Sequence, residues 1–220
     1  MNKEINYAIE KEKLLVIKGD MPLKKASDEV KNDKIVASSL LSKNGMELKY
    51  FSDEIKNNEF CVKIAINNNG LALRYASKEL RDNEEIVLMA IKNNPLALEY
   101  ASKRLRSKYD LIIQAVSKNG MALKYVLGDY NNNLEVVMLA VTNNGLALRY
   151  AHPDKQDEKN IVLLAVQNDG TSLEFASKRA KQDKYIVKYA LEENENAIEY
   201  VDDSIIDFVK NNYCAKKKTK

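Results

Sequence analysis

The sequence predicts an all-α fold, an α-solenoid of about eight helix–turn–helix repeats of 25 residues each. Three observations predict it. A fixed break, usually Asn-Gly, begins each copy, and each copy then carries apolar residues at helical spacing, as in Ile86, Val87, Ala90 and Ile91. An aromatic residue also recurs every 25 residues, as Tyr50, Tyr75, Tyr100, Tyr125, Tyr150, Phe175 and Tyr200.

The two ends of the array depart from the repeat. Residues 1–19 are expected to form an N-terminal capping helix, because 14–17 is apolar in register with the second half of a repeat. Residues 20–212 form the tandem repeats of one solenoid, with a shortened last copy. Residues 213–220 are a basic C-terminal tail. Atypical terminal units are typical of solenoids, because these units face water.

The first helix of each repeat is predicted to follow an N-cap Asn, or Asp169 in one copy. Pro95 follows Asn94, and proline is tolerated at the first helical position. This helix should have about two turns, from Leu71 to Ser77 in one copy. The row of serines that includes Ser77 is interpreted as local capping groups.

The second helix is predicted to run from Glu84 to Asn93 in the same copy, with Ile86, Val87, Ala90 and Ile91 buried. The small residue at the Ala90 position should let neighbouring helices approach closely. Its N-caps are expected at Asn32, Asn57, Asp82, Ser107, Asn132 and Asp157. Glu85, Asp110 and Glu135 follow at the spacing of a capping box.

A leucine-rich-repeat-like α/β horseshoe is the alternative. Leu71, Leu73 and Tyr75 alternate as in a short strand, and leucine-rich repeats have a similar period. The residue between the leucines, however, is alanine in most copies, where a half-exposed strand would carry a polar residue. The all-α solenoid is therefore favoured.

The phrases Asn69-Gly70-Leu71-Ala72-Leu73-Arg74-Tyr75-Ala76-Ser77 and 144–151 resemble a repeat family catalogued as domain of unknown function 4116. The resemblance covers roughly residues 20–200. It implies tandem helical repeats of a kind found in bacteria, including intracellular pathogens, and in protists. It implies no catalytic residue and no ligand. The chain departs from the pattern at Leu127-Gly128 and His152-Pro153, where the first helix should end early or turn differently.

Composition and charge limit the partners. The formal net charge is +3, but four positive charges lie in the last five residues, which leaves −1 on the rest. A near-neutral body is a poor electrostatic match for nucleic acid. Two cysteines, Cys61 and Cys214, make no disulfide framework, and the sequence shows neither a signal peptide nor an apolar run long enough to span a membrane. A cytoplasmic location is therefore expected.

No constellation of catalytic residue types is present. His152 is the only histidine, and its one acidic neighbour at short range is Asp154. Acid–base or metal chemistry usually needs a cluster, so His152 is interpreted as a loop residue before Pro153. The glycines stand singly and form no phosphate-binding loop. The protein is predicted not to be an enzyme and to need no cofactor or metal.

Two rows of residues vary between copies and are candidates for a partner-binding surface. One row on the second helix is polar in the outer copies but apolar in the middle, which suggests an apolar strip that docks a partner. It consists of Leu88, Ile113, Met138 and Leu163. A charged row on the first helix includes Arg74, Glu99, Lys124 and Arg149. Packing within the monomer is the alternative for the strip, and a solvated face for the charged row.

Two functions follow from these features. The first is a non-enzymatic helical repeat module that binds a protein or peptide. The second is nucleic-acid binding, since some helical repeats bind one base per unit. The charge of −1 outside the tail makes a nucleic-acid partner the weaker hypothesis. No membrane partner is expected, and the oligomeric state is left open.

Overall fold

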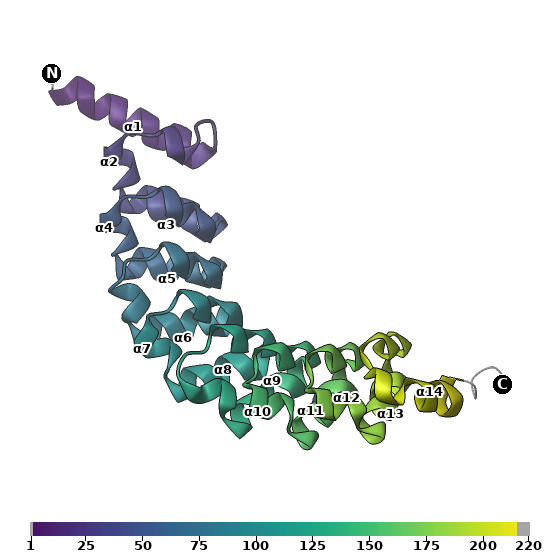
Figure 1. Cartoon of the computed structure of the whole chain (residues 1–220). Helices are drawn as coiled ribbons and strands as arrows, with labels where there is room; N and C mark the ends of the chain where they lie inside the picture. Colours follow the sequence, from purple (N-terminus) through teal and green to yellow (C-terminus); the bar gives the residue numbers. More distant parts are fainter. Residues whose placement is uncertain (1, 215–220) are drawn as a thin grey trace. The chain divides into compact units, whose positions relative to one another are not determined.

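The computed structural model describes residues 2–214, with side chains from 4 to 213, and within this range it contains helices and no strand (Figure 1). The all-α prediction is confirmed, and the horseshoe alternative finds no support. The chain divides into two compact units, Met1–Leu105 and Arg106–Lys220, which are described separately. The predicted basic tail lies outside the described residues apart from Tyr213 and Cys214.

The N-terminal unit begins with α1 (Asn2–Lys18), the helix within the predicted capping segment. Its α-helices are α2 (Asp28–Lys31), α3 (Lys34–Lys43), α4 (Asp53–Lys56), α5 (Glu59–Asn68) and α6 (Glu84–Asn93), and α7 (Lys103–Arg106) extends one residue beyond it. Between them are 3-10 helices, η1 (Leu23–Lys25), η2 (Gly45–Tyr50), η3 (Gly70–Tyr75), η4 (Leu80–Asp82) and η5 (Pro95–Tyr100).

The C-terminal unit repeats the same pattern. Its α-helices are α8 (Tyr109–Lys118), α9 (Leu134–Asn143), α10 (Pro153–Gln156), α11 (Lys159–Asn168), α12 (Lys178–Gln182), α13 (Lys184–Glu193) and α14 (Ile206–Val209). Its 3-10 helices are η6 (Gly120–Tyr125), η7 (Asp129–Asn132), η8 (Gly145–Tyr150), η9 (Gly170–Phe175), η10 (Glu195–Tyr200) and η11 (Asp203–Ile205), and a π-helical turn, η12 (Lys210–Cys214), follows α14.

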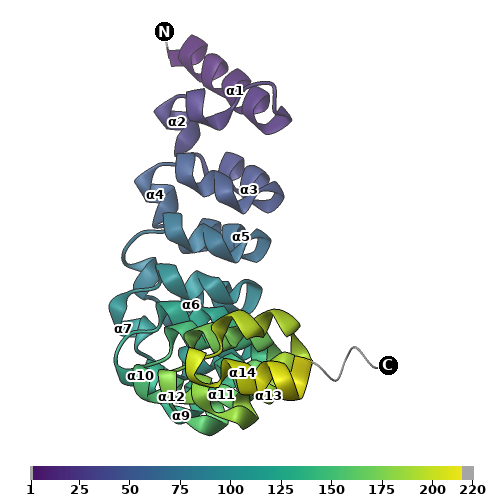
Figure 2. The ribbon, with the colours of Figure 1, turned by 45° about the vertical axis from the view of Figure 1, so that its right-hand side comes forward.

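Each unit has two layers. The ten-residue α-helices pack on one another, α3 on α5 and then α6 in the N-terminal unit, and α8, α9, α11 and α13 in the C-terminal unit (Figures 1 and 2). The six-residue 3-10 helices form the second layer, as with η8 and η9. The core lies between the layers, where the predicted buried face of α6 has no exposed surface. A repeat thus buries its apolar face against its neighbours.

The first helix of each repeat is a 3-10 helix and not the α-helix that the two-turn prediction implied. In one copy η3 ends at Tyr75, because Ala76 is extended, with φ −65° and ψ 156°. Ser77 belongs to the next turn, where its hydroxyl accepts the Leu80 amide at 3.2 Å. Three residues per turn place two turns in so short a segment. The predicted Asn caps are confirmed, with Asn69 Oδ1 accepting the Leu71 amide at 3.0 Å.

The N-caps predicted for the second helix are wrong by one residue. Asn83, and not Asp82, caps α6 by accepting the Glu85 and Ile86 amides, and the same shift holds at Asp33, Asn58 and Asn133. Asp183 caps α13 in the same way, in a copy for which no cap was predicted. The capping box is therefore absent at Glu85, which forms an ion pair with Lys63 at 2.7 Å. Asp82 and Asn83 are both of a type preferred at the N-cap, so the sequence does not distinguish them, and only the backbone conformation does.

The residues predicted as caps instead join neighbouring repeats. A serine hydroxyl of the following repeat donates to the side chain of Asn32, Asn57, Asp82 or Asp157.

The first helix was predicted to end early or turn differently at the two departures from the repeat, Leu127-Gly128 and His152-Pro153. Gly128 turns the chain with φ +76°, while η6 and η8 end at the same position as the other 3-10 helices. The prediction is confirmed at Leu127-Gly128, where the chain turns differently. It is wrong at His152-Pro153, where η8 does not end early and His152 has the extended conformation found at Ser52.

Close approach of the two helices within a repeat explains the glycine that begins most of the six-residue 3-10 helices. A Cβ on Gly120 would lie 2.1 Å from the Ala140 carbonyl oxygen. The alanine itself is fully buried, as predicted for a position that lets helices approach. The same contact recurs at Gly45, Gly70, Gly145 and Gly170. Glycine is therefore required at these positions because there is no room for a side chain, and not because of a positive φ.

A second asparagine row, which was not predicted to have a structural role, clamps four of the repeats to the preceding one. Asn143 Oδ1 accepts the Gly120 amide at 2.8 Å, and its Nδ2 donates to the Ser117 carbonyl at 3.2 Å. Asn68, Asn93 and Asn168 form the same pair of bonds. The clamp satisfies a helix-start amide and a helix-end carbonyl together.

One N-cap should make stability depend on pH. Burial raises the pKa of Asp183, but hydrogen bonds from Lys159 and two backbone amides outweigh it, so the pKa lies below the usual value. A carboxyl with a lowered folded-state pKa stabilises the fold above its unfolded pKa of about 3.9 and loses that contribution as pH falls through the folded pKa. Asp183→Asn should therefore lower the free energy of unfolding by up to about 1 kcal/mol at pH 7 and by less near pH 3. Urea unfolding at both pH values measures this, and an equal difference at both contradicts it.

Candidate protein-binding surface

The predicted apolar strip lies at the surface of the α-helical layer. Ile113, Met138 and Leu163 occupy the fifth position of α8, α9 and α11 in the C-terminal unit, where α9 packs against both other helices. Leu88 occupies the same position of α6 in the N-terminal unit. Met138 is 37% exposed and the other three are half-buried. None of the four is a core residue, so the strip in the C-terminal unit is available for contact.

The most exposed part of the strip surrounds a surface hollow on α9, here called the α9 hollow. It has a volume of about 420 Å³ and is lined by Asn133, Leu134, Glu135, Met138 and Leu139. Leu134 is 47% exposed. Leu134 was not predicted as a site residue, although one signal in the sequence pointed to it. Its position, the first of the helix, holds Lys34, Glu59, Glu84, Lys159 or Lys184 in most other copies.

A hydrogen bond lies beside the α9 hollow. The Tyr109 hydroxyl, at the start of α8, donates to Glu135 Oε2 at 2.6 Å. This bond to Glu135 raises the pKa of Tyr109, because an adjacent carboxylate disfavours the phenolate. The Tyr109 ring also lies 6.0 Å from the Tyr130 ring, centroid to centroid. The apolar surface is therefore bordered by an ordered polar group and an aromatic pair.

The predicted charged row lies in the other layer, on the 3-10 helices, so the eight predicted residues do not form one site. Arg74, Glu99, Lys124 and Arg149 are all exposed. Arg149 lies over two rings, at 5.3 Å from Tyr150 and 5.0 Å from Phe175. The repeated aromatic residues are half-buried. The basic groups of this row thus form cation–π contacts with aromatic rings of the same chain.

A second exposed apolar pair, also missed from the sequence, lies on the N-terminal unit. Ile35 is 75% exposed and Phe60 is 65% exposed, each at the second position of its helix, α3 and α5. These helices pack against each other (Figure 2). Glu85 occupies the same position in a later copy, and the position was therefore interpreted as part of a capping box. For this reason the apolar side chains of the earlier copies were not predicted to be exposed.

The histidine and the buried cysteine, whose side chains could in principle act in catalysis or bind a metal, have local environments that explain them. His152 caps α10, with its Nδ1 accepting the Asp154 amide at 3.3 Å. Cys61 is buried, which raises the pKa of its thiol, and Cys214 lies beyond the described side chains. From residue 4 to residue 213, no three His, Cys, Asp or Glu side chains are grouped so that they could hold a metal ion. Within the described chain, no helix combines the length and apolar character needed to cross a membrane.

Comparison with known proteins gave one family. A model described as "Domain of unknown function (DUF4116)" matches five overlapping segments, 33–81, 58–106, 83–129, 108–154 and 158–206. Most segments span two repeats, and the first four begin 25 residues apart. Each begins at the N-cap of a ten-residue α-helix, such as Asp33 or Asn58. No curated protein and no solved structure matched the chain.

Proposed function

This chain belongs to the DUF4116 family, and we propose that it is a non-enzymatic repeat module that binds a protein or peptide partner. The observation that carries the proposal is the apolar strip of the C-terminal unit, Ile113, Met138 and Leu163, with the α9 hollow at its centre. In the copy on α13 the corresponding residue is Lys188, as expected of a position that otherwise faces water.

The chemistry of the strip favours a polypeptide partner. Exposed methionine and leucine side chains around a hollow can enclose an apolar side chain, and burying their surface supplies the favourable energy of association. The Tyr109–Glu135 pair can contribute polar contacts at the rim. An apolar helix face that meets a groove in this way is a common mode of peptide recognition.

Nucleic-acid binding is the second candidate, and one observation favours it. The 3-10 layer presents half-buried tyrosines with basic groups beside them, as with Lys49 over Tyr50 at 4.4 Å. Aromatic rings and cations together bind single-stranded nucleic acid. The acidic members of the row, Glu99, Glu174 and Glu199, and the net charge of −1 outside the last five residues count against it.

A matched pair of substitutions on one helix tests the first candidate. Met138→Lys places a charge in the α9 hollow, whereas Thr142→Lys places the same charge on an exposed position one turn further along α9. Affinity capture from lysate of the source cells, followed by identification and titration of any partner, should give about tenfold weaker binding for Met138→Lys and unchanged binding for Thr142→Lys. Circular dichroism should show both variants folded.

The salt dependence of the binding affinity distinguishes protein binding from nucleic-acid binding. A partner bound through the apolar strip should keep most of its affinity between about 50 and 200 mM salt, whereas nucleic acid held by six or more phosphates should lose about 10³-fold. Equal loss of a partner by both variants, or retention of every partner by Met138→Lys, contradicts a role for the strip. Recovery of nucleic acid alone, with steep salt dependence, supports the second candidate.

A further inference from the structure

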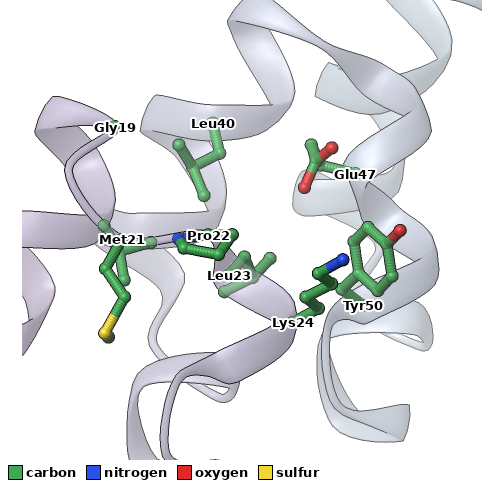
Figure 3. Close-up of a pocket in the computed structure, with 9 residues that line it drawn as sticks. Gly19, Met21, Pro22, Leu23, Lys24, Leu40, Glu47 and Tyr50 are labelled. Atoms are coloured by element: carbon green, nitrogen blue, oxygen red, sulfur yellow. The ribbon is translucent and has the colours of Figure 1, made fainter.

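A pocket of about 390 Å³ opens on the first repeat of the N-terminal unit (Figure 3). The end of α1, the turn at Gly19–Pro22, η1, α3 and η2 all contribute to it. Figure 3 shows Leu23, Leu40 and the Glu47 side chain around one space, with Lys24 and Tyr50 at its edge. Its volume lies at the small end of the range of ligand pockets, about 300–1,000 Å³.

Two lining residues break the repeat pattern at this pocket. Glu47 occupies a position that is alanine in most other copies, and those alanines, Ala72, Ala97, Ala122, Ala147 and Ala197, are fully buried. Leu40 likewise stands where the next six copies have a fully buried alanine. A larger apolar side chain and a carboxylate thus replace two small core residues, and both line the same cavity.

The two charged groups of the pocket are not paired with each other. Neither Lys24 nor Glu47 forms an ion pair with any residue whose side chain the structure describes. Among the residues that the structure describes, the single hydrogen bond to the Glu47 carboxylate comes from Asn44 Nδ2 at 3.5 Å, which is longer than an ordinary hydrogen bond. The pocket therefore offers one anion, one cation and an apolar floor to an incoming molecule.

We propose that this pocket binds a free apolar α-amino acid. Lys24 binds the α-carboxylate, Glu47 binds the α-ammonium group, and Leu23 and Leu40 contact the side chain. Charge complementarity selects this class, because a neutral or singly charged apolar molecule would leave one of the two groups without a counter-charge. The site lies in the N-terminal unit and is independent of the strip on α8, α9 and α11.

Titration of the full chain with L-leucine, followed by amide chemical shifts in ¹⁵N-labelled protein, tests the proposal. Saturable shifts are expected at Gly19, Met21, Glu47 and Tyr50. L-leucinamide, which lacks the carboxylate and resembles a peptide N-terminus, should bind about tenfold more weakly or worse. N-acetyl-L-leucine, which lacks the ammonium group and resembles a peptide C-terminus, should be weakened similarly.

Three variants connect the binding to the named residues. Glu47→Ala restores the residue of most other repeats and should fold, yet bind leucine about tenfold more weakly or worse. Glu47→Gln keeps the shape of the side chain and removes its charge, and should lose affinity to the same extent. Lys124→Ala changes the basic residue at the Lys24 position of another repeat and should leave leucine affinity unchanged.

Absence of saturable shifts up to the solubility of leucine overturns the proposal. So does equal affinity for leucine and either capped derivative, or unchanged affinity in folded Glu47→Ala or Glu47→Gln protein. A capped derivative that binds more tightly than leucine would assign the pocket to a peptide terminus instead of a free amino acid.

Discussion

Gly120→Ala should lower the free energy of unfolding by about 3 kcal/mol or more, although alanine is ordinarily the better helix former. The added methyl group would lie 2.1 Å from the Ala140 carbonyl oxygen and 3.0 Å from its carbonyl carbon. Both atoms belong to the backbone of α9, so no side-chain rotation can relieve the overlap. The 3-10 helix η6 and α9, which belong to the same repeat, would have to separate, which removes apolar contact between the two layers.

Gly128→Ala is the matched control in the same unit. Gly128 has φ +76°, and the nearest atom to an added Cβ there is a ring carbon of Tyr130 at 3.8 Å. With ψ −167° this positive φ lies in a region that is essentially restricted to glycine, so the expected cost of alanine is backbone strain of about 1–3 kcal/mol. Urea unfolding of both variants, monitored by circular dichroism, measures the difference. A Gly120→Ala variant as stable as the parent chain would show that η6 and α9 are not packed this closely.

Asn143→Ala should lower the free energy of unfolding by about 2 kcal/mol, because it removes both bonds of the clamp between repeats. The Gly120 amide loses its acceptor and the Ser117 carbonyl loses its donor. A partly buried amide without a partner costs about 1–3 kcal/mol, whereas the exposed carbonyl can bind water. The effect should thus come mainly from the amide.

Two further variants separate the halves of the clamp. Asn143→Asp keeps an acceptor for the Gly120 amide and should be closer to the parent chain than alanine, as the natural Glu193 copy shows by accepting the Gly170 amide. Thr142→Ala, at the exposed neighbouring position, should change stability by less than about 0.5 kcal/mol. Equal stability of Asn143→Ala and Thr142→Ala would exclude the clamp as a source of stability.

Several parts of the fold could be predicted from the sequence because they depend on residues close together in the chain. The 25-residue recurrence gave the repeats, and the spacing of Ile86, Val87, Ala90 and Ile91 gave the buried face of α6. The recurrent Asn before Gly gave the helix start at Asn69. The variation at Met138 pointed to a position that lies at the surface.

Other parts could not be predicted, because one repeat does not specify how its neighbour approaches. The exposure of Leu134 and Phe60 depends on which side of a helix the next repeat leaves uncovered. Glu47 looked like one polar residue among many until the turn at Met21 and Pro22 placed it in a pocket. The separation of Arg149 from the apolar strip likewise follows from the division into two layers.

By itself, then, the sequence determined the repeat, its period, its helical class and its buried face, because these are periodic properties of local sequence. Only the tertiary structure decided between Asp82 and Asn83 as the cap, and between α and 3-10 geometry at Gly70–Tyr75. It alone revealed the bonds that span 20 residues from one repeat to the next and those that span 23 residues within a repeat. These features depend on how the two helices of a repeat pack on each other and on the next repeat, which the identity of single residues does not fix.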